Sequence, residues 1–164
     1  MQTFSQSSPL PGPAAEILAA ISTEAYLLHR YKDAELHHLH IEVSQDDDTR
    51  FASSVRRTGS TSRLPGFARK LVGDRLTLVQ EQFWDRRAEP YQGGLDLRVE
   101  GMPGHVRTRL SLRDNGDGTS TLQARGEIEA GIPLLGGRIE KMLAGHAQEA
   151  FEKSVEAIRG YLAQ

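Results

Sequence analysis

The C-terminal part of the chain carries its longest helical pattern. There is no proline after Pro133. Apolar or small side chains then recur in three- and four-residue steps along one stripe of an α-helix: Leu135, Ile139, Met142, Leu143, Ala147, Ala150, Phe151, Ile158 and Leu162. A helix over residues 135–162 would be about 40 Å long at about 1.5 Å per residue. Because this exceeds the core of a small domain, the rest of the chain must supply a whole face for the helix to cross.

The middle of the chain alternates apolar and polar residues with a period of two, which is typical of β-strands with one buried and one solvated face. The alternation is clearest in residues 93–100, 106–113 and 121–129. Residues 38–44, 49–58 and 76–84 also predict strands, and residues 63–75 predict a short helix or lid between them. Turn sequences such as Gly101–Gly104 and Asp114–Gly118 separate the segments. We therefore expect about six antiparallel strands here.

The N-terminal part predicts one more short strand, then a proline-containing turn and two short helices over residues 14–21 and 23–31. A sheet with one apolar face needs a cover, and the C-terminal helix is the only predicted element large enough to provide it. The sequence thus predicts an α+β fold in which a curved antiparallel sheet of about seven strands packs the long helix in its concave face. We expect residues 1–164 to form a single domain.

The composition excludes several classes of protein. A net charge of −2 over 164 residues gives no reason to expect nucleic acid as a partner. The chain has no cysteine, which excludes disulfides, thiol nucleophiles and thiolate metal ligands. It also has no apolar run of the roughly 18 residues that a membrane span requires, and its first residues do not resemble a signal peptide. We therefore expect a cytoplasmic protein that is a monomer or a weak homodimer.

The predicted order of elements resembles the helix-grip fold of the START and birch-pollen-allergen-like (Bet v 1-like) superfamily, also called SRPBCC. Two stretches, Leu64–Trp84 and Gly131–Ala163, are also similar to a bacterial branch known as a domain of unknown function. The wider superfamily includes carriers of lipids and other hydrophobic ligands, polyketide cyclases and dehydratases, and partner-binding adaptors. The resemblance therefore implies a fold but does not select a function. The branch has no catalytic motif, so no catalytic residue is carried over.

The stripe of the long helix contains unusually small residues: Gly136, Gly137, Ala144, Gly145, Ala147 and Ala150. One interpretation is a close approach of the helix backbone to the sheet. The other is room for an apolar ligand, bounded by helix residues and by the apolar sheet face. The candidate lining residues are then Met142, Leu143 and Phe151 on the helix, and Trp84, Leu97 and Leu110 on the strands.

The strand over residues 76–84 has two possible orientations. If Gln80, Gln82 and Trp84 face inward, two amides and a large ring line the cavity and suit a carbonyl or hydroxyl group on an otherwise apolar ligand. If this face is outward, Val79 and Phe83 belong to the core instead. His146 lies near the inner stripe of the helix and is a candidate polar group of the pocket, or a buried hydrogen-bonded histidine.

Two clusters of polar residues have both a functional and a structural interpretation. Positive residues gather around the lid segment: Arg56, Arg57, Arg63, Arg69, Lys70 and Arg75. They could form a cationic rim that binds an anionic headgroup, with Arg69 and Lys70 as its main residues. Alternatively, they form only a solvated surface. The histidines His37, His38 and His40 could suggest a metal, but no further ligand has a recognisable spacing. We expect neither a metal nor a cofactor.

Three functions follow from these patterns. The first is binding of a small, mostly hydrophobic molecule, lipid-like or polyketide-like, between the sheet and the long helix. The second is a cyclase- or dehydratase-like enzyme that uses the same cavity, with Glu81 and His146 as its ionisable groups. The third is an interaction module with a filled core. We favour the first, because the scattered ionisable residues form no nucleophile–base set.

Overall fold

The computed structural model describes residues 1–32 and 38–164, which form seven strands and four helices. The strands are β1 (Gln2–Pro11), β2 (His38–Asp46), β3 (Arg50–Ser60), β4 (Arg75–Asp85), β5 (Tyr91–Val99), β6 (His105–Asp114) and β7 (Thr119–Glu129). The helices are α1 (Ala14–Ile21), α2 (Glu24–Tyr31), α3 (Gly66–Val72) and α4 (Gly136–Leu162). The predicted α+β class and the long C-terminal helix are both confirmed.

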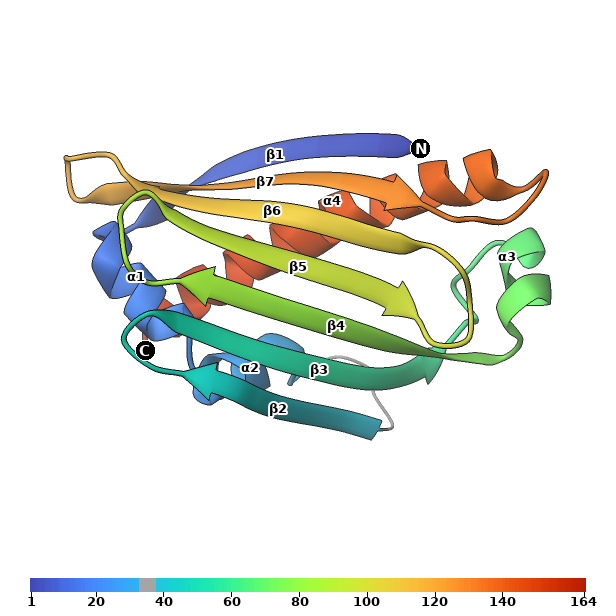
Figure 1. The fold of residues 1–164 in the computed structure, drawn as a ribbon, viewed down its shortest axis with the longest axis horizontal. Helices are drawn as coiled ribbons and strands as arrows, with labels where there is room; N and C mark the ends of the chain where they lie inside the picture. Colours follow the sequence, from blue (N-terminus) through green and yellow to red (C-terminus); the bar gives the residue numbers. More distant parts are fainter. Residues whose placement is uncertain (33–37) are drawn as a thin grey trace.

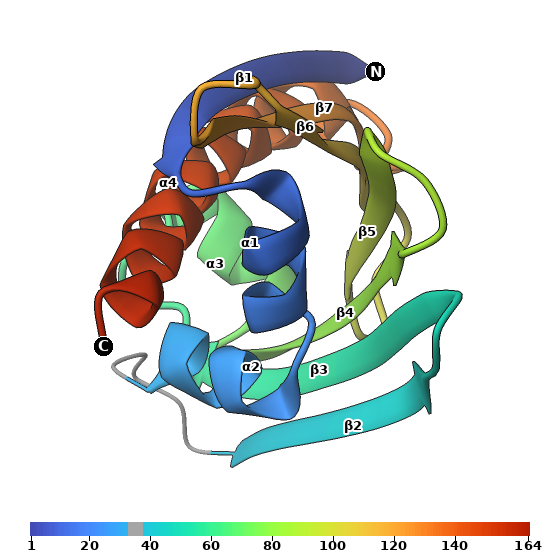
Figure 2. The same ribbon diagram turned by 90° about the vertical axis from the view of Figure 1, so that its left-hand side faces the viewer.

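All seven strands form one antiparallel sheet in the order β1-β7-β6-β5-β4-β3-β2 (Figure 1). The sheet curves strongly, and α4 lies across its open side, as the end view shows (Figure 2). There α4 packs against β1, β7, α1 and α2. The arrangement is the helix-grip fold that the order of elements predicts.

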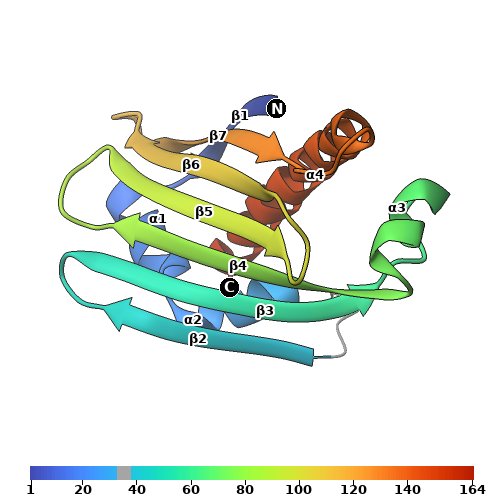
Figure 3. The same ribbon diagram turned by 45° about the vertical axis from the view of Figure 1, so that its right-hand side comes forward.

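The two ends of the molecule are packed differently. The short helices α1 and α2 fill one end of the concave face, where Ile17 and Leu112 are completely buried within a large hydrophobic core. At the opposite end α3 lies near the start of α4 (Figure 3), and Ala68 is its only buried residue. The contact between these two helices includes the Arg138 guanidinium, which lies 4.1 Å from the centre of the Phe67 ring.

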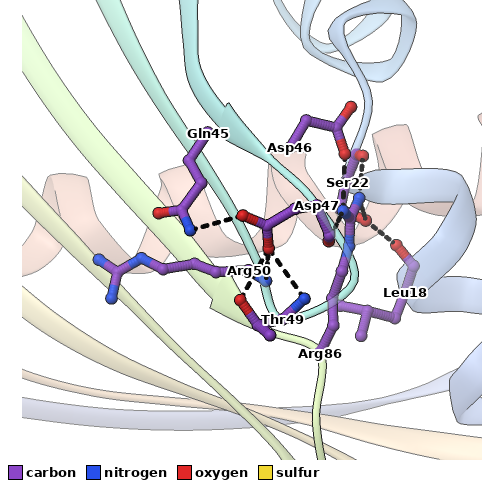
Figure 4. A network of polar contacts seen from close by, with 8 residues as sticks. All are labelled: Leu18, Ser22, Gln45, Asp46, Asp47, Thr49, Arg50 and Arg86. Carbon is purple, nitrogen blue, oxygen red and sulfur yellow. Dashed lines mark hydrogen bonds and ion pairs between the residues drawn. The ribbon is translucent and has the colours of Figure 1, made fainter.

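Arg86 joins the junction of α1 and α2 to the turn between β2 and β3 (Figure 4). Its Nη2 group donates hydrogen bonds to both the carbonyl and the hydroxyl oxygen of Ser22, at 3.0 Å each. Its Nη1 group donates to the Asp47 carbonyl at 2.8 Å and pairs with the Asp46 carboxylate at 2.6 Å. Ser22 is fully buried, so this single guanidinium supplies a donor to a carbonyl that water does not reach.

Replacing Arg86 by methionine is expected to lower the free energy of unfolding by about 1–3 kcal/mol, because a buried acceptor loses a charged donor. Urea unfolding followed by circular dichroism measures this loss. Arg87→Met is the matched control: the Arg87 side chain is 69% exposed and, among the described residues, pairs with Asp85 alone, so its loss should cost less than about 0.5 kcal/mol. Equal losses in the two variants would contradict the proposed role of Arg86.

Candidate ligand cavity

A cavity of about 170 Å³ lies between the concave face of the sheet and the helices. An apolar cavity of about 150 Å³ in another protein binds benzene, so this one has room for an aromatic ring or a short aliphatic chain. The strands contribute Phe4, Arg57, Gln80, Gln82, Trp84, Leu95, Leu97, Val106, Thr108, Leu110, Leu122 and Ala124. The helices contribute Ile21, Tyr26, Leu27, Arg30, Tyr31, Ala147, Ala150, Phe151, Ser154 and Ile158.

The orientation of β4 follows from its register with the neighbouring strands. Gln80 is opposite Leu97 of β5, and both line the cavity. Two residues further on, Gln82 lines the cavity, and Trp84 does so with only 3% of its surface exposed. The structure thus places Gln80, Gln82 and Trp84 on the concave face and Phe83 on the outer face.

The consecutive glycines of β5 make this arrangement possible. A Cβ atom on Gly93 would lie 2.8 Å from Cε3 of the Trp84 indole, and a Cβ on Gly94 would lie 2.5 Å from Cε1 of the Phe83 ring. Real Cβ atoms do not approach other carbons so closely, because the two atoms would overlap, and packed protein interiors do not contain such overlaps. Each aromatic ring of β4 therefore lies over a glycine of β5, Trp84 on the inside and Phe83 on the outside.

The polar part of the cavity is a hydrogen-bonded group at the end of α2. The Gln80 amide nitrogen donates to the Tyr31 hydroxyl at 2.8 Å, and Arg57 Nη1 donates to the Gln80 amide oxygen at 3.3 Å. The Arg57 guanidinium lies 4.9 Å from the centre of the Tyr31 ring, and the Arg30 guanidinium lies 5.0 Å from the same ring. Burial lowers the pKa of Arg57, yet an arginine remains charged at neutral pH because its ordinary pKa is so high. Two cations thus line one side of an otherwise apolar cavity.

Arg30 also connects the two helices that border the cavity. Its Nε atom donates to the Ser154 hydroxyl at 3.1 Å, and its Nη2 atom donates to the Ala150 carbonyl at 3.4 Å. These bonds hold the end of α2 against the second half of α4. Nearby, burial raises the pKa of Tyr26 far above its usual value, so this phenol stays protonated.

Six of the predicted ligand-binding residues line the cavity: Gln80, Gln82, Trp84, Leu97, Leu110 and Phe151. Met142 and Leu143 are half-buried but do not line it. His146, expected near the inner stripe, is 49% exposed and lies 3.9 Å from the Glu149 carboxylate. Neighbouring residues on a helix point about 100° apart, so a stripe through Ala147 and Ala150 turns His146 toward solvent.

The small residues of α4 have two different environments. A Cβ atom on Gly136, Gly137 or Gly145 would meet no atom within 4 Å, so the interpretation that these glycines permit close approach to the sheet is wrong. Ala147 and Ala150 do line the cavity. Ala147 is half-buried and Ala150 is exposed, so Ala147 is the position at which a small side chain leaves space inside the cavity.

The residues of the expected cationic rim do not lie together in the structure. Arg69 and Lys70 are exposed on α3 and do not line the cavity, whereas Arg57 lies inside it. Sequence reasoning missed Arg30 and Tyr31, which reach the cavity from the last turn of α2. A signal for Arg57 was present, because Phe51 and Val55 precede it at even spacing on the same strand face.

The other polar candidates lie away from the cavity. His38 and His40 are exposed on β2, and His37 lies outside the described residues. Within residues 1–32 and 38–164, no group of three or more histidine, aspartate or glutamate side chains is placed to hold a metal. Glu81 is exposed on the outer face of β4 and His146 is exposed on α4, so the prediction that this pair could act as catalytic groups is wrong. None of the described helices is long and apolar enough to cross a membrane.

Solved structures with the same fold cover almost the whole chain at low sequence identity. Protein TTHA0849 from Thermus thermophilus has a TM-score of 0.66 at 15% identity and covers 99% of this chain and 97% of its own. A START superfamily protein from Mycobacterium smegmatis has a TM-score of 0.59 at 19% identity and covers 98% of both chains. The Zhui aromatase/cyclase from Streptomyces sp. R1128 has a TM-score of 0.60 at 10% identity, covering 97% of this chain and 92% of its own.

Such identities establish the fold and not the function. No curated protein matches the sequence significantly. The model of one sequence family, described as protein of unknown function (DUF2505), matches residues 5–162. Because this match spans nearly the whole sequence, the chain belongs to the DUF2505 family, and the structural neighbours show that it has the helix-grip fold.

Proposed function

We propose that this protein binds one small, mostly hydrophobic molecule in the cavity between the sheet and α4. The cavity itself supports this proposal most directly: about 170 Å³ remain open beside a hydrophobic core that is otherwise well packed. Protein interiors are normally close-packed, with few voids larger than a water molecule. The volume suits a single ring or a short chain, which restricts the lipid-like or polyketide-like candidates to small molecules.

The residues that line the cavity favour binding over a reaction. None of the described lining residues is an aspartate, a glutamate or a histidine, the side chains that most often transfer protons in enzymes. The apolar side chains would enclose the ligand, and the polar group around Tyr31 would fix its orientation. An open cavity also disfavours an interaction module with a filled core.

Filling the cavity is expected to weaken binding without unfolding the protein. Ala147→Leu adds three carbon atoms at a residue that lines the cavity, so the affinity for a small alkylbenzene such as ethylbenzene should fall about tenfold or more, which corresponds to about 1.4 kcal/mol. Burial of the added carbons should leave the free energy of unfolding unchanged or raise it. Isothermal titration calorimetry gives the affinity, and urea unfolding gives the stability.

Gln148→Leu is the matched control, because it creates the same side chain one position further on, at an exposed residue of the same helix. This variant should bind ethylbenzene as the wild type does. Two results would contradict the proposed function: a wild-type protein that binds no alkylbenzene, or an Ala147→Leu variant that binds as tightly as the wild type.

A further inference from the structure

The cations of the cavity differ from the arginines of the surface. On the outside, Arg56 pairs with Glu100, Arg87 with Asp85 at 2.6 Å, and Arg107 with Asp96 at 3.6 Å, although exposed pairs contribute little to stability. Arg57 is half-buried inside the cavity, and burial lowers the pKa of its guanidinium. A buried charge is normally paired, and Arg57 is therefore the arginine most in need of an anion.

The protein does not supply that anion in the part of the chain that the structure describes. Arg57 has five N–H donors, and the side chain that accepts a hydrogen bond from it, the Gln80 amide, is neutral. Arg30 likewise donates only to neutral groups, the Ser154 hydroxyl and the Ala150 carbonyl. Within residues 1–32 and 38–164, neither arginine has a carboxylate partner.

The two arginines lie against the same aromatic ring, that of Tyr31. Both guanidinium groups lie within 5.0 Å of the centre of the Tyr31 ring, and the charge of Arg30 disfavours the charged form of Arg57. Two like charges beside one ring in a partly buried site raise the free energy of the empty protein. A bound anion would remove this repulsion and would accept hydrogen bonds from the free donors.

We propose that the ligand is an amphiphilic acid, whose carboxylate binds Arg57 beside Arg30 and whose apolar part fills the cavity toward Leu97, Val106 and Leu110. This inference rests on the function proposed above and adds the chemical class of the ligand. The cavity volume limits the apolar part to one aromatic ring or a short chain. An arylalkanoic acid with a single ring, or a short fatty acid, has both features.

The hydrogen-bonded neighbours prepare Arg57 for this role. The Gln80 amide accepts from Arg57 while it donates to Tyr31, so the guanidinium is held in place before a ligand arrives. The Tyr31 ring lies against both cations and carries a negative face that partly stabilises them. A site that is ordered in advance loses less conformational entropy on binding.

The test compares an acid with its uncharged isostere. We expect wild-type protein to bind 3-phenylpropanoate about tenfold or more tightly than 3-phenylpropanamide at pH 7, because hydrogen bonds to charged groups are stronger than those to neutral ones. Isothermal titration calorimetry at one salt concentration measures both affinities. This comparison requires no variant, so a folding defect cannot obscure it.

A variant then assigns the preference to one residue. Arg57→Met keeps an unbranched side chain without the charge. Because the charge-assisted hydrogen bonds are lost, the preference for the acid over the amide should fall to about twofold or less. The amide should still bind. Arg56→Met is the matched control on the same strand, since Arg56 is exposed and pairs with Glu100 on the outside; the acid should keep its full preference. Circular dichroism checks that both variants are folded, and Arg57→Gln replaces Arg57→Met if the latter is not.

The outcomes separate this inference from the proposed function. If ethylbenzene binds but the acid binds no more tightly than the amide, the ligand is not selected by charge, and only the inference is overturned. A preference that persists in the folded Arg57 variant also overturns it, because the anion would then bind elsewhere. If the wild type binds neither ethylbenzene nor the acid, both proposals fail.

Discussion

Gly104→Ala is expected to lower the free energy of unfolding by about 3 kcal/mol or more, a large fraction of the stability of a typical domain. Two costs combine at this position, in the turn between β5 and β6. The residue has φ +101°, where any side chain other than hydrogen costs about 1–2 kcal/mol. A Cβ atom there would also lie 2.3 Å from the Glu129 carbonyl oxygen and 2.5 Å from that of Ala130. Because these are backbone atoms at the end of β7, relieving the overlap costs about 1–3 kcal/mol more.

Gly101→Ala in the same turn separates the two costs. Gly101 also has a positive φ, +80°, but a Cβ atom there would meet nothing within 4 Å. We therefore expect a loss of only about 1–2 kcal/mol, the conformational cost alone. Urea unfolding of both variants, with unchanged dependence on denaturant, gives the comparison. Equal stabilities would show that the turn moves freely away from β7 and that the overlap at Gly104 has no energetic importance.

Trp84→Ala is expected to cost about 3–5 kcal/mol, the range for a buried aromatic residue truncated to alanine. The indole is 3% exposed, belongs to the main hydrophobic core and forms part of the cavity wall. Its removal would leave an unfilled space over Gly93 of β5. Neighbouring side chains in a packed core relax only partly into such a space.

The adjacent Phe83→Ala is the appropriate control for this second prediction. Phe83 is half-buried on the outer face of β4, where the Arg50 guanidinium lies 4.1 Å from the centre of its ring. Solvent can fill the space that this ring leaves, so we expect less than half the loss of Trp84→Ala. Chemical unfolding measures both losses. If the two substitutions cost the same, the concave face is not the better-packed side of the sheet.

Local periodicity was sufficient to predict the architecture. The predicted helix over residues 135–162 corresponds to α4 at Gly136–Leu162, because one proline and an unbroken apolar stripe define its limits. Of the three strands with the clearest alternation, β6 and β7 have the predicted buried faces, whereas Leu95, Leu97 and Val99 of β5 are only half-buried. Both features depend on residues only a few positions apart, and a single sequence records such spacing directly.

The polar part of the candidate site could not be predicted in the same way. Arg30 meets Ser154 across 124 residues of sequence, and Gln80 meets Tyr31 across 49. Such contacts depend on how α2 and α4 are placed over the sheet, and no local pattern contains that information. Arg57 was instead grouped with Arg56 by charge, although the period of two sends neighbouring strand residues to opposite faces.

The rotation of α4 about its axis was the remaining uncertainty. The stripe predicted from apolar and small residues was broad enough to include His146, but the side that faces the cavity is the narrower one of Ala147, Ala150, Phe151, Ser154 and Ile158. The polar residue Ser154 lies on this side because its hydroxyl accepts a hydrogen bond from Arg30. Hydrophobicity alone therefore placed the helix correctly but assigned its orientation only approximately.

The uneven packing of the two ends has a consequence for how a small molecule could reach the cavity. Separating α3 from α4 would disrupt little buried surface, since only Ala68 of α3 is buried, whereas moving α1 would expose Ile17 and the core around it. Local opening requires least free energy where the fewest apolar contacts are lost. If the proposed ligand binds, the α3 end is therefore where we expect local opening to cost least, while the seven strands stay paired.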